Sequence, residues 1–396
     1  MTDELLNYRS EFPILETTTY MISHSLGAMP RKVYDRVREY ADTWATRGIR
    51  AWAEGWWQMP VTTGNKIASL IGAAQGEVVM HQNVSVGVSL ILSALNYRSS
   101  RNRILYVDVE FPTVIYVLEA QRKQGAEVVC IPSPDGLEVP IEKLIDAIDE
   151  RTLIVPISYV FFKTSTRIDI ERVVKRAHDA GAYVLLDVYQ ATGVVPIDVK
   201  KWDIDFLVGG SVKWLCGGPG AGYLYVNPSL YSMMEPSVTG WVAHEHPFAF
   251  ETGAIKYAEN SMRFLHGSPQ IPVLYAAEPG YDIINRAGVD NIRKKSVQQT
   301  SRMIELCDER KFKVQTPRDP DKRGGTIVVD VPYGDAVVKE LTAREILVDY
   351  RPGAGIRISP HLYTLDSEID LTFDAIDEIL KTKSYQKHLK ERGSLY

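Results

Sequence analysis

The chain has 396 residues, enough for two or three domains with a large hydrophobic core. Apolar residues make up 45% and charged residues 24%, the composition of an ordinary globular enzyme. The net charge of −5 shows no excess of basic residues of the kind that binds nucleic acid, and no apolar run is long enough to span a bilayer. Three scattered cysteines cannot form a disulfide framework, and the acidic N-terminus is unlike a secretory signal, so we expect a protein of the reducing cytoplasm.

The first hundred residues predict mainly helical structure. We expect helices over residues 30–44, 64–73 and about 83–95, and a strand over residues 77–80. Asn83 or Ser85 could cap the third helix, whose free N–H groups would suit an anion such as a phosphate. A capped helix without a ligand is the commoner arrangement, so this pattern alone leaves both interpretations open.

Two further features of this region carry more than one interpretation. Four of the seven tryptophans gather at Trp44, Trp52, Trp56 and Trp57. They could line an aromatic substrate pocket, but we favour packing of this segment against the body or a second subunit. His24 lies in the stretch S-H-S-L-G, where we favour a hydrogen-bonded residue of a turn.

From residue 104 onwards the pattern alternates between short apolar runs and amphipathic segments. We expect strands over residues 104–109, 127–131, 153–158, 183–186, 206–208 and 223–226, and helices over residues 141–148 and 170–180. This alternation is typical of an α/β protein with a mainly parallel sheet. In such sheets ligands bind at the carboxyl ends of the strands.

Polar residues follow two of these strands at the positions where a ligand site is expected. Asp187 closes one strand, and Lys213 follows the next, just before a glycine-rich turn at residues 217–220. An acid and a lysine so placed fit pyridoxal phosphate (PLP): the lysine would hold the aldehyde as a Schiff base, and the acid would keep the pyridinium nitrogen protonated. On spacing alone, a loop-capping acid and a solvated lysine fit equally well.

The last third predicts a second, smaller unit. We expect one long helix over about residues 281–310, and then two strands around a helix between Lys313 and Val348. Arg357 alternates with isoleucines on a further strand, where an arginine usually points to solvent or pairs with an acid. His244 and His246 lie close together, but no carboxylate–histidine constellation accompanies them, so we predict no metal site.

Longer motifs carry a family resemblance. The stretch D-x-x-Q-x-x-G from Asp187, followed by D-F-x-x-G-G-S-x-K-W-L-x-G-G-P-G, resembles the class-V aminotransferases, which are fold-type I PLP enzymes. The segments F-P-T, G-W-x-x-H and R-K-K-S resemble its kynureninase-like branch. The resemblance implies a large domain with a mainly parallel mixed sheet and a small α/β C-terminal domain. We place an N-terminal segment that packs with the small domain at residues 1–50, the large PLP-binding domain at 51–265, and the small domain at 266–396.

The resemblance also implies roles for individual residues. Lys213 matches the Schiff-base lysine and Asp187 the acid at the ring nitrogen, which makes these two the expected catalytic residues. Arg357 matches the arginine that binds the substrate α-carboxylate, as a guanidinium can do bidentately. The remaining matches to cofactor-binding positions are Val84 and Ser85 at the phosphate, Phe111 stacked on the ring, Ser158, Gln190, Ser211, Trp241, and Ser268 from a neighbouring subunit.

These matches imply an enzyme that acts on a small α-amino acid through an external aldimine and a quinonoid, as a homodimer with shared active sites. Kynureninase-like cleavage of a C–C bond is the expected reaction, and class-V transamination or Cβ–S lyase and desulfurase-type chemistry are the alternatives. The chain departs from kynureninases at Val114, Val212, Cys216 and Thr364. Phe161 and Phe162 also replace more polar residues of that branch, which could change the substrate pocket. A desulfurase needs a mobile cysteine downstream of the lysine, and Cys307, in a predicted helix, does not fit that role.

Overall fold

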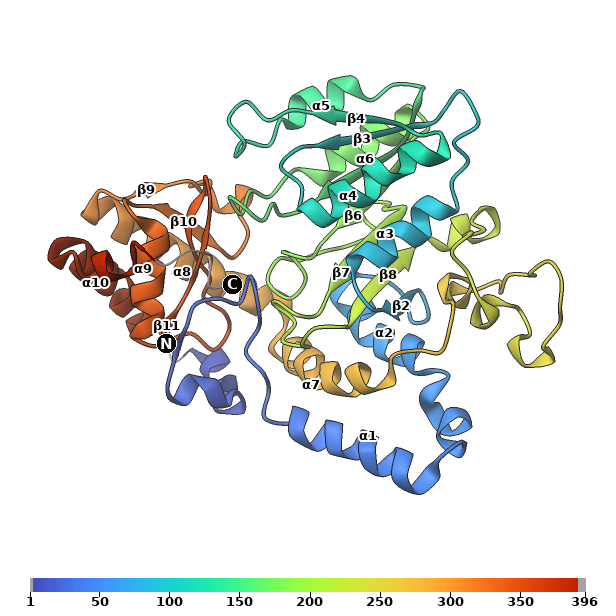
Figure 1. Ribbon diagram of the computed structural model, residues 1–396, viewed down its shortest axis with the longest axis horizontal. Helices are drawn as coiled ribbons and strands as arrows, with labels where there is room; N and C mark the ends of the chain where they lie inside the picture. Colours follow the sequence, from blue (N-terminus) through green and yellow to red (C-terminus); the bar gives the residue numbers. More distant parts are fainter. Residues whose placement is uncertain (1–2, 391–396) are drawn as a thin grey trace.

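The computed structural model describes residues 3–390, in which a seven-stranded sheet lies between helices and a smaller unit follows it (Figure 1). The strand order is β2-β8-β7-β6-β5-β3-β4, and only β8 runs antiparallel to its neighbours. The strands are β2 (Val78–His81), β3 (Arg103–Val107), β4 (Glu127–Ile131), β5 (Thr152–Ser158), β6 (Tyr183–Asp187), β7 (Phe206–Gly210) and β8 (Gly222–Val226). The predicted α/β fold with a mainly parallel sheet is therefore confirmed.

Side-chain alternation along the strands builds two hydrophobic cores, one on each face of the sheet. On β6, Val184 and Leu186 pack into one core and Leu185 into the other, because successive side chains of a strand point to opposite faces. The first core is completed by α2 (Met59–Ile71), α5 (Ile141–Ala147), α6 (Ile170–Asp179) and α7 (Ile271–Ala287), and the second by α3 (Val84–Ser93) and α4 (Pro112–Ala120). Helix α4 was not among the predicted elements.

The pairing of β5, β6 and β7 sets the place of the polar strand ends. Ser158, the last residue of β5, lies opposite Asp187, the last residue of β6, and Asp187 lies opposite Val208 on β7. Because these strands are parallel, their carboxyl ends meet at one edge of the sheet. The chain passes from β7 to Lys213 at this same edge.

The C-terminal unit, orange to red in Figure 1, has its own sheet and its own core. Its antiparallel sheet has the order β12-β13-β10-β9. The elements are α8 (Val289–Arg310), β9 (Lys313–Val314), β10 (Ile327–Asp330), α9 (Gly334–Ala343), β11 (Ile346–Leu347), β12 (Asp349–Arg351), β13 (Gly355–Ile358) and α10 (Asp366–Thr382). The predicted block of two strands around a helix corresponds to β10, α9 and β11.

The N-terminal segment touches both units. Strand β1 (Thr19–Tyr20) pairs in parallel with β11 of the C-terminal unit, whereas α1 (Val33–Arg47) packs on α7. The division of the chain into domains at residues 50 and 265 stays a prediction. No helix within residues 3–390 is long and apolar enough to cross a membrane.

The single long helix predicted over residues 281–310 is wrong, because the structure has two helices there. Helix α7 ends at Ala287 and α8 begins at Val289, and Gly288 between them has a φ of 78°. Its N–H still donates to the Ile284 carbonyl at 3.0 Å, but the left-handed backbone turns the chain away. The apolar periodicity continues across the break, which is why the pattern concealed it, whereas the glycine is the helix-stop signal.

Candidate active site

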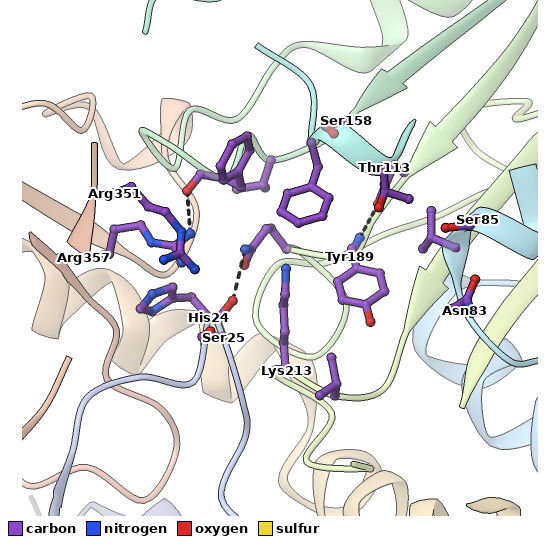
Figure 2. Close-up of a pocket in the computed structure, with 17 residues that line it drawn as sticks. His24, Ser25, Asn83, Ser85, Thr113, Ser158, Tyr189, Lys213, Arg351 and Arg357 are labelled. Carbon is purple, nitrogen blue, oxygen red and sulfur yellow. Dashed lines mark hydrogen bonds between the residues drawn. The ribbon is translucent and has the colours of Figure 1, made fainter. Parts of the chain in front are cut away.

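A cavity of about 310 Å³ opens at the carboxyl edge of the large sheet, between that sheet and the C-terminal unit (Figure 2). Three distant parts of the chain line it: the segment after β1, the strand ends and loops of the large sheet, and strands β12 and β13. Its lining residues are His24, Ser25, Asn83, Val84, Ser85, Phe111, Thr113, Ser158, Val160, Phe162, Asp187, Tyr189, Gln190, Val212, Lys213, Arg351 and Arg357.

Lys213 and Asp187, the two predicted catalytic residues, both line this cavity. The Lys213 ammonium lies 4.4 Å from the ring centre of Tyr189 and 5.8 Å from that of Phe111. Loss of water lowers the pKa of Lys213 to about 7, the nearby Arg357 charge acts in the same direction, and Asp187 opposes both. The lysine therefore has a substantial neutral, nucleophilic fraction at neutral pH.

The Asp187 carboxyl group is placed where it could pair with a cation bound in the cavity. Its Oδ1 accepts the Tyr189 N–H at 2.8 Å. Burial raises the pKa of Asp187 to about 6, while the Tyr189 hydrogen bond and the Lys213 charge work against that rise. A protonated ring nitrogen placed beside this carboxyl would hold it ionised.

The N-terminus of α3 forms another wall of the cavity. The Asn83 side chain accepts the Val86 N–H at 3.1 Å and caps the helix, which leaves the N–H groups of Val84 and Ser85 at the cavity. A helix N-terminus favours an anion such as a phosphate. With an amine, an acid, the exposed ring of Phe111 and this helix end in one cavity, the residues present fit PLP.

Three predicted cofactor residues lie outside this cavity. The Ser211 hydroxyl is buried, donates to the Ala221 carbonyl at 2.6 Å and makes a short hydrogen bond with the Tyr281 hydroxyl. Trp241 packs against Trp57 and two phenylalanines, and Ser268 is exposed. The roles of all three at a phosphate or ring stay predictions, and Ser268 was expected to serve a neighbouring subunit rather than its own.

Arg357 is fixed by a buried acid that the sequence analysis did not single out. Its Nε donates to Asp349 Oδ1 at 2.7 Å and one terminal nitrogen to Oδ2 at 2.5 Å, while the other donates to the Phe162 carbonyl at 2.9 Å. Arg351 also reaches Asp349 Oδ2, at 3.0 Å. Burial alone would raise the pKa of Asp349, but its charged and hydrogen-bonded partners hold that pKa well below its ordinary value.

His24 belongs to the same cluster and is more than a turn residue. Its Nε2 lies 2.9 Å from Asp349 Oδ1, and its Nδ1 makes a short hydrogen bond with the Ser359 hydroxyl. Burial and the Arg357 charge lower the pKa of His24 to about 4, so the ring is neutral at neutral pH. Its carbonyl accepts a hydrogen bond from the Gln190 amide at 3.1 Å.

The sequence offered signals for the residues that were missed. His24 stands in the quoted S-H-S-L-G stretch, and Asp349 and Arg351 alternate on β12, directly before the quoted arginine strand. Tyr189 stands between Asp187 and Gln190 in the central motif. The tryptophans of this cluster do not line the cavity. Trp56 is buried beside Tyr40 and donates to the Tyr275 hydroxyl, whereas Trp44 is 62% exposed.

The cysteines and acids supply no competing centre in the part of the chain that is described. Cys216 and Cys307 are buried, Cys130 is exposed, and none of the three lines the cavity. Among residues 3–390, no group of three histidine, cysteine or acidic side chains could hold a metal ion.

Comparison with known proteins agrees with this geometry. The profile of the aminotransferase class-V family matches residues 19–365. A kynureninase of Pseudomonas fluorescens is 31% identical over 97% of this chain and 94% of its own length. A kynureninase of Shouchella clausii is 28% identical over 98% of this chain and 95% of its own length.

Solved structures show the same fold at lower identity. The apo structure of a cysteine desulfurase from Thermococcus onnurineus NA1 superposes with a TM-score of 0.84 and 22% identity, covering 96% of this chain and 99% of that one. A mutant of C-DES with glycine covalently linked to its PLP cofactor also has a TM-score of 0.84, with 19% identity over 93% of this chain and 99% of that one. The family match over most of the chain, together with the lysine and acid in one cavity, shows that this chain belongs to the class-V aminotransferase family and is a PLP-dependent enzyme.

Proposed function

We propose that the enzyme cleaves the Cβ–Cγ bond of an α-amino acid hydrolytically, as the reaction of its kynureninase relatives implies. The observation that carries the proposal is the similarity to proteins named kynureninase along nearly the whole chain, at 26–31% identity. The site supports it because Lys213, Asp187 and Arg357 face one cavity.

PLP, when bound, supplies an electron sink that stabilises negative charge at the substrate Cα. Lys213 would hold the cofactor aldehyde and, once released by the substrate amine, its neutral amine would remove and return protons at Cα. The Asp187 carboxylate would keep the ring nitrogen protonated. Phe111 and Tyr189 would keep water away from the Lys213 amine, which lies over both rings.

Arg357 would bind the substrate carboxylate from a fixed position. Asp349 occupies one edge of its guanidinium and the Phe162 carbonyl takes one further N–H, which leaves other N–H groups for a ligand. The plane of the guanidinium is therefore set before the substrate arrives. Pre-organisation of this kind lowers the entropic cost of orienting Cα toward Lys213.

Most of the departures from kynureninases lie outside the cavity, but two line it. Val114 is a buried residue of α4, Cys216 is buried against Gly27, and the Thr364 hydroxyl accepts the His361 N–H at 2.9 Å. Val212 and Phe162 are the departures that line the cavity, whereas Phe161 is buried and does not line it. Phe162 and Phe111, with ring centres 5.2 Å apart, give the cavity an aromatic wall that suits an aryl side chain.

Desulfurase chemistry has less support than cleavage. A persulfide route requires a cysteine sulfur at the substrate, and the three cysteines lie away from the cavity. The desulfurase structures match at 22% identity or less, so this similarity supports the fold and not the reaction.

The test is a single-turnover reaction of the PLP-loaded enzyme with kynurenine and 3-hydroxykynurenine, without an added ketoacid. Cleavage predicts alanine and an anthranilate-type product with PLP regenerated, and Lys213→Ala is the inactive control. Stoichiometric pyridoxamine phosphate without cleavage would move the enzyme to transamination. No change with either compound would contradict the proposed substrate class.

We further propose that the enzyme is a homodimer in which Ser268 completes the partner's phosphate site. Support comes from the exposure of Ser268 and of a neighbouring aromatic group, in which Trp241, Phe248 and Phe250 are 37%, 56% and 72% exposed. Apolar surface of this kind commonly marks an interface. Sedimentation of an active, strictly monomeric enzyme would contradict the proposal.

A further inference from the structure

A buried glutamate, Glu110, stands directly behind the cavity wall. It is 2% exposed, and both of its carboxyl oxygens contact one residue. Its Oε1 accepts the Ser158 N–H at 2.8 Å, and its Oε2 makes a short hydrogen bond with the Ser158 hydroxyl. Ser158 in turn lines the cavity (Figure 2). It also lies beside Asp187 in the pairing of β5 with β6.

The surroundings of Glu110 favour its protonated form. Burial raises the pKa of Glu110 to about 8, the charge of Asp187 adds to the rise, and the two Ser158 hydrogen bonds oppose it. Asp108, two positions earlier, is turned to the Ser133 N–H, and Lys213 lies beside Tyr189 on another wall. A carboxyl that the active-site function does not use thus keeps its proton at neutral pH.

The proton on Glu110 decides what the Ser158 hydroxyl offers to the cavity. An ionised carboxylate can only accept, so Ser158 must then direct its hydroxyl hydrogen at Glu110. A protonated Glu110 can donate to the Ser158 oxygen instead, which leaves the hydroxyl hydrogen free to point into the cavity. The two states differ by one hydrogen-bond donor at the strand end next to Asp187.

We propose that Glu110 is a positioning residue that retains a proton and so keeps Ser158 as a hydrogen-bond donor to an anionic oxygen bound in the cavity. This inference rests on the proposed function, because it requires PLP and an amino acid as ligands. The anionic oxygen belongs either to the cofactor ring or to the amino acid. Above about pH 8 the donor is withdrawn and that oxygen is held less tightly.

The matched variant is Glu110→Gln, whose amide donates to the Ser158 oxygen and accepts its N–H at every pH. Glu142→Gln, an exposed glutamate paired with Arg172, is the control. The visible spectrum of the PLP-loaded enzyme is titrated from about pH 6 to about pH 10. If the ring oxygen is the acceptor, the alkaline transition moves in Glu110→Gln and in Ser158→Ala but stays in Glu142→Gln.

If the acceptor is an oxygen of the amino acid, Glu110→Gln leaves the alkaline transition of the visible spectrum unchanged. The affinity of the enzyme for an unreactive amino acid should then depend on pH. It should fall about tenfold through pH 8 in the wild type, the usual effect of one charge-assisted hydrogen bond, and stay level in Glu110→Gln. If neither the spectrum nor the affinity responds to Glu110→Gln, the proposal is overturned.

A third measurement needs no turnover and so separates this inference from the proposed reaction. The folded pKa of Glu110 lies above its ordinary value of 4.5, so the folded state binds the extra proton between about pH 4.5 and pH 8. The contribution of Glu110 to the free energy of unfolding should therefore fall with rising pH in this window. Buried histidines such as His24 act in the opposite direction in both proteins, so the test is the difference: the free energy of unfolding of Glu110→Gln should increase relative to that of the wild type as the pH rises. An identical slope in both proteins would show that Glu110 does not hold the proton.

Discussion

Replacement of Asp349 by alanine is the most informative single test of the site. The change removes the carboxylate that accepts from Arg357 twice, contacts Arg351 at 3.0 Å and meets His24 at 2.9 Å. The side chains of Asp349 and Arg357 are only 1% and 3% exposed, so water cannot replace the lost partner. The buried Arg357 guanidinium would then lose both of its hydrogen bonds to a carboxylate.

The expected cost follows from that burial. Loss of one partner of a buried ion pair typically costs about 3–5 kcal/mol, because the remaining charge stays desolvated. The three arginine contacts share one carboxylate, so they do not add separately, and a single loss within this range is expected. An ion pair exposed at the surface typically contributes less than about 1 kcal/mol to stability.

The chain provides a matched control in Asp308, which pairs bidentately with Arg318 at 2.7 and 2.8 Å but with 52% and 60% of the side chains exposed. Urea unfolding should give a several-fold larger loss of unfolding free energy for Asp349→Ala than for Asp308→Ala. The pKa of Asp349 in the folded state lies below its ordinary value of 3.8. The difference between the two variants in lost unfolding free energy should therefore persist down to about pH 4 and shrink only at lower pH. Equal losses in the two variants at neutral pH would refute the reasoning.

Three further predictions concern single residues. Borohydride should trap PLP on Lys213 with a pH midpoint near 7 rather than 10.5, because the buried amine is neutral above that value; Lys213→Ala should take no label. Asp187→Ala should lose on the order of 3 kcal/mol of transition-state stabilisation, about a hundredfold in turnover, while label on Lys213 persists; near wild-type turnover would place the acid elsewhere. Gly288→Ala should lower the free energy of unfolding by about 1 kcal/mol because a side chain is strained at a φ of 78°; an unchanged urea midpoint would contradict this.

The large sheet could be predicted closely because its strands are buried on both faces. Strand β7 and helix α6 start at the predicted residues, since an uninterrupted apolar run and a clear amphipathic pattern mark them. The α7–α8 boundary could not be read from periodicity, because the apolar stripe continues through Gly288. One backbone conformation, rather than side-chain polarity, ends the helix there.

The residues at strand ends could be predicted, but the partners that hold them could not. Lys213 and Asp187 follow apolar strands of one sheet, so topology alone brings them together. Asp349 and Arg357 are only eight positions apart, yet their pairing depends on the antiparallel register of β12 and β13. His24 and Asp349 are 325 positions apart, a contact that no local pattern encodes.

These long-range contacts set the separation between the cofactor side of the cavity and its carboxylate side. The Gln190 amide, three residues past Asp187, donates to the His24 carbonyl, and the His24 ring meets Asp349, which orients Arg357. The hydrogen bonds thus run from the large sheet through the N-terminal segment to the C-terminal unit. A neutral His24 suits this place, because an additional positive charge would compete with Arg357 for Asp349. The histidine therefore acts as a spacer between two charged groups, and its burial beside Arg357 keeps it uncharged at the pH at which both groups act.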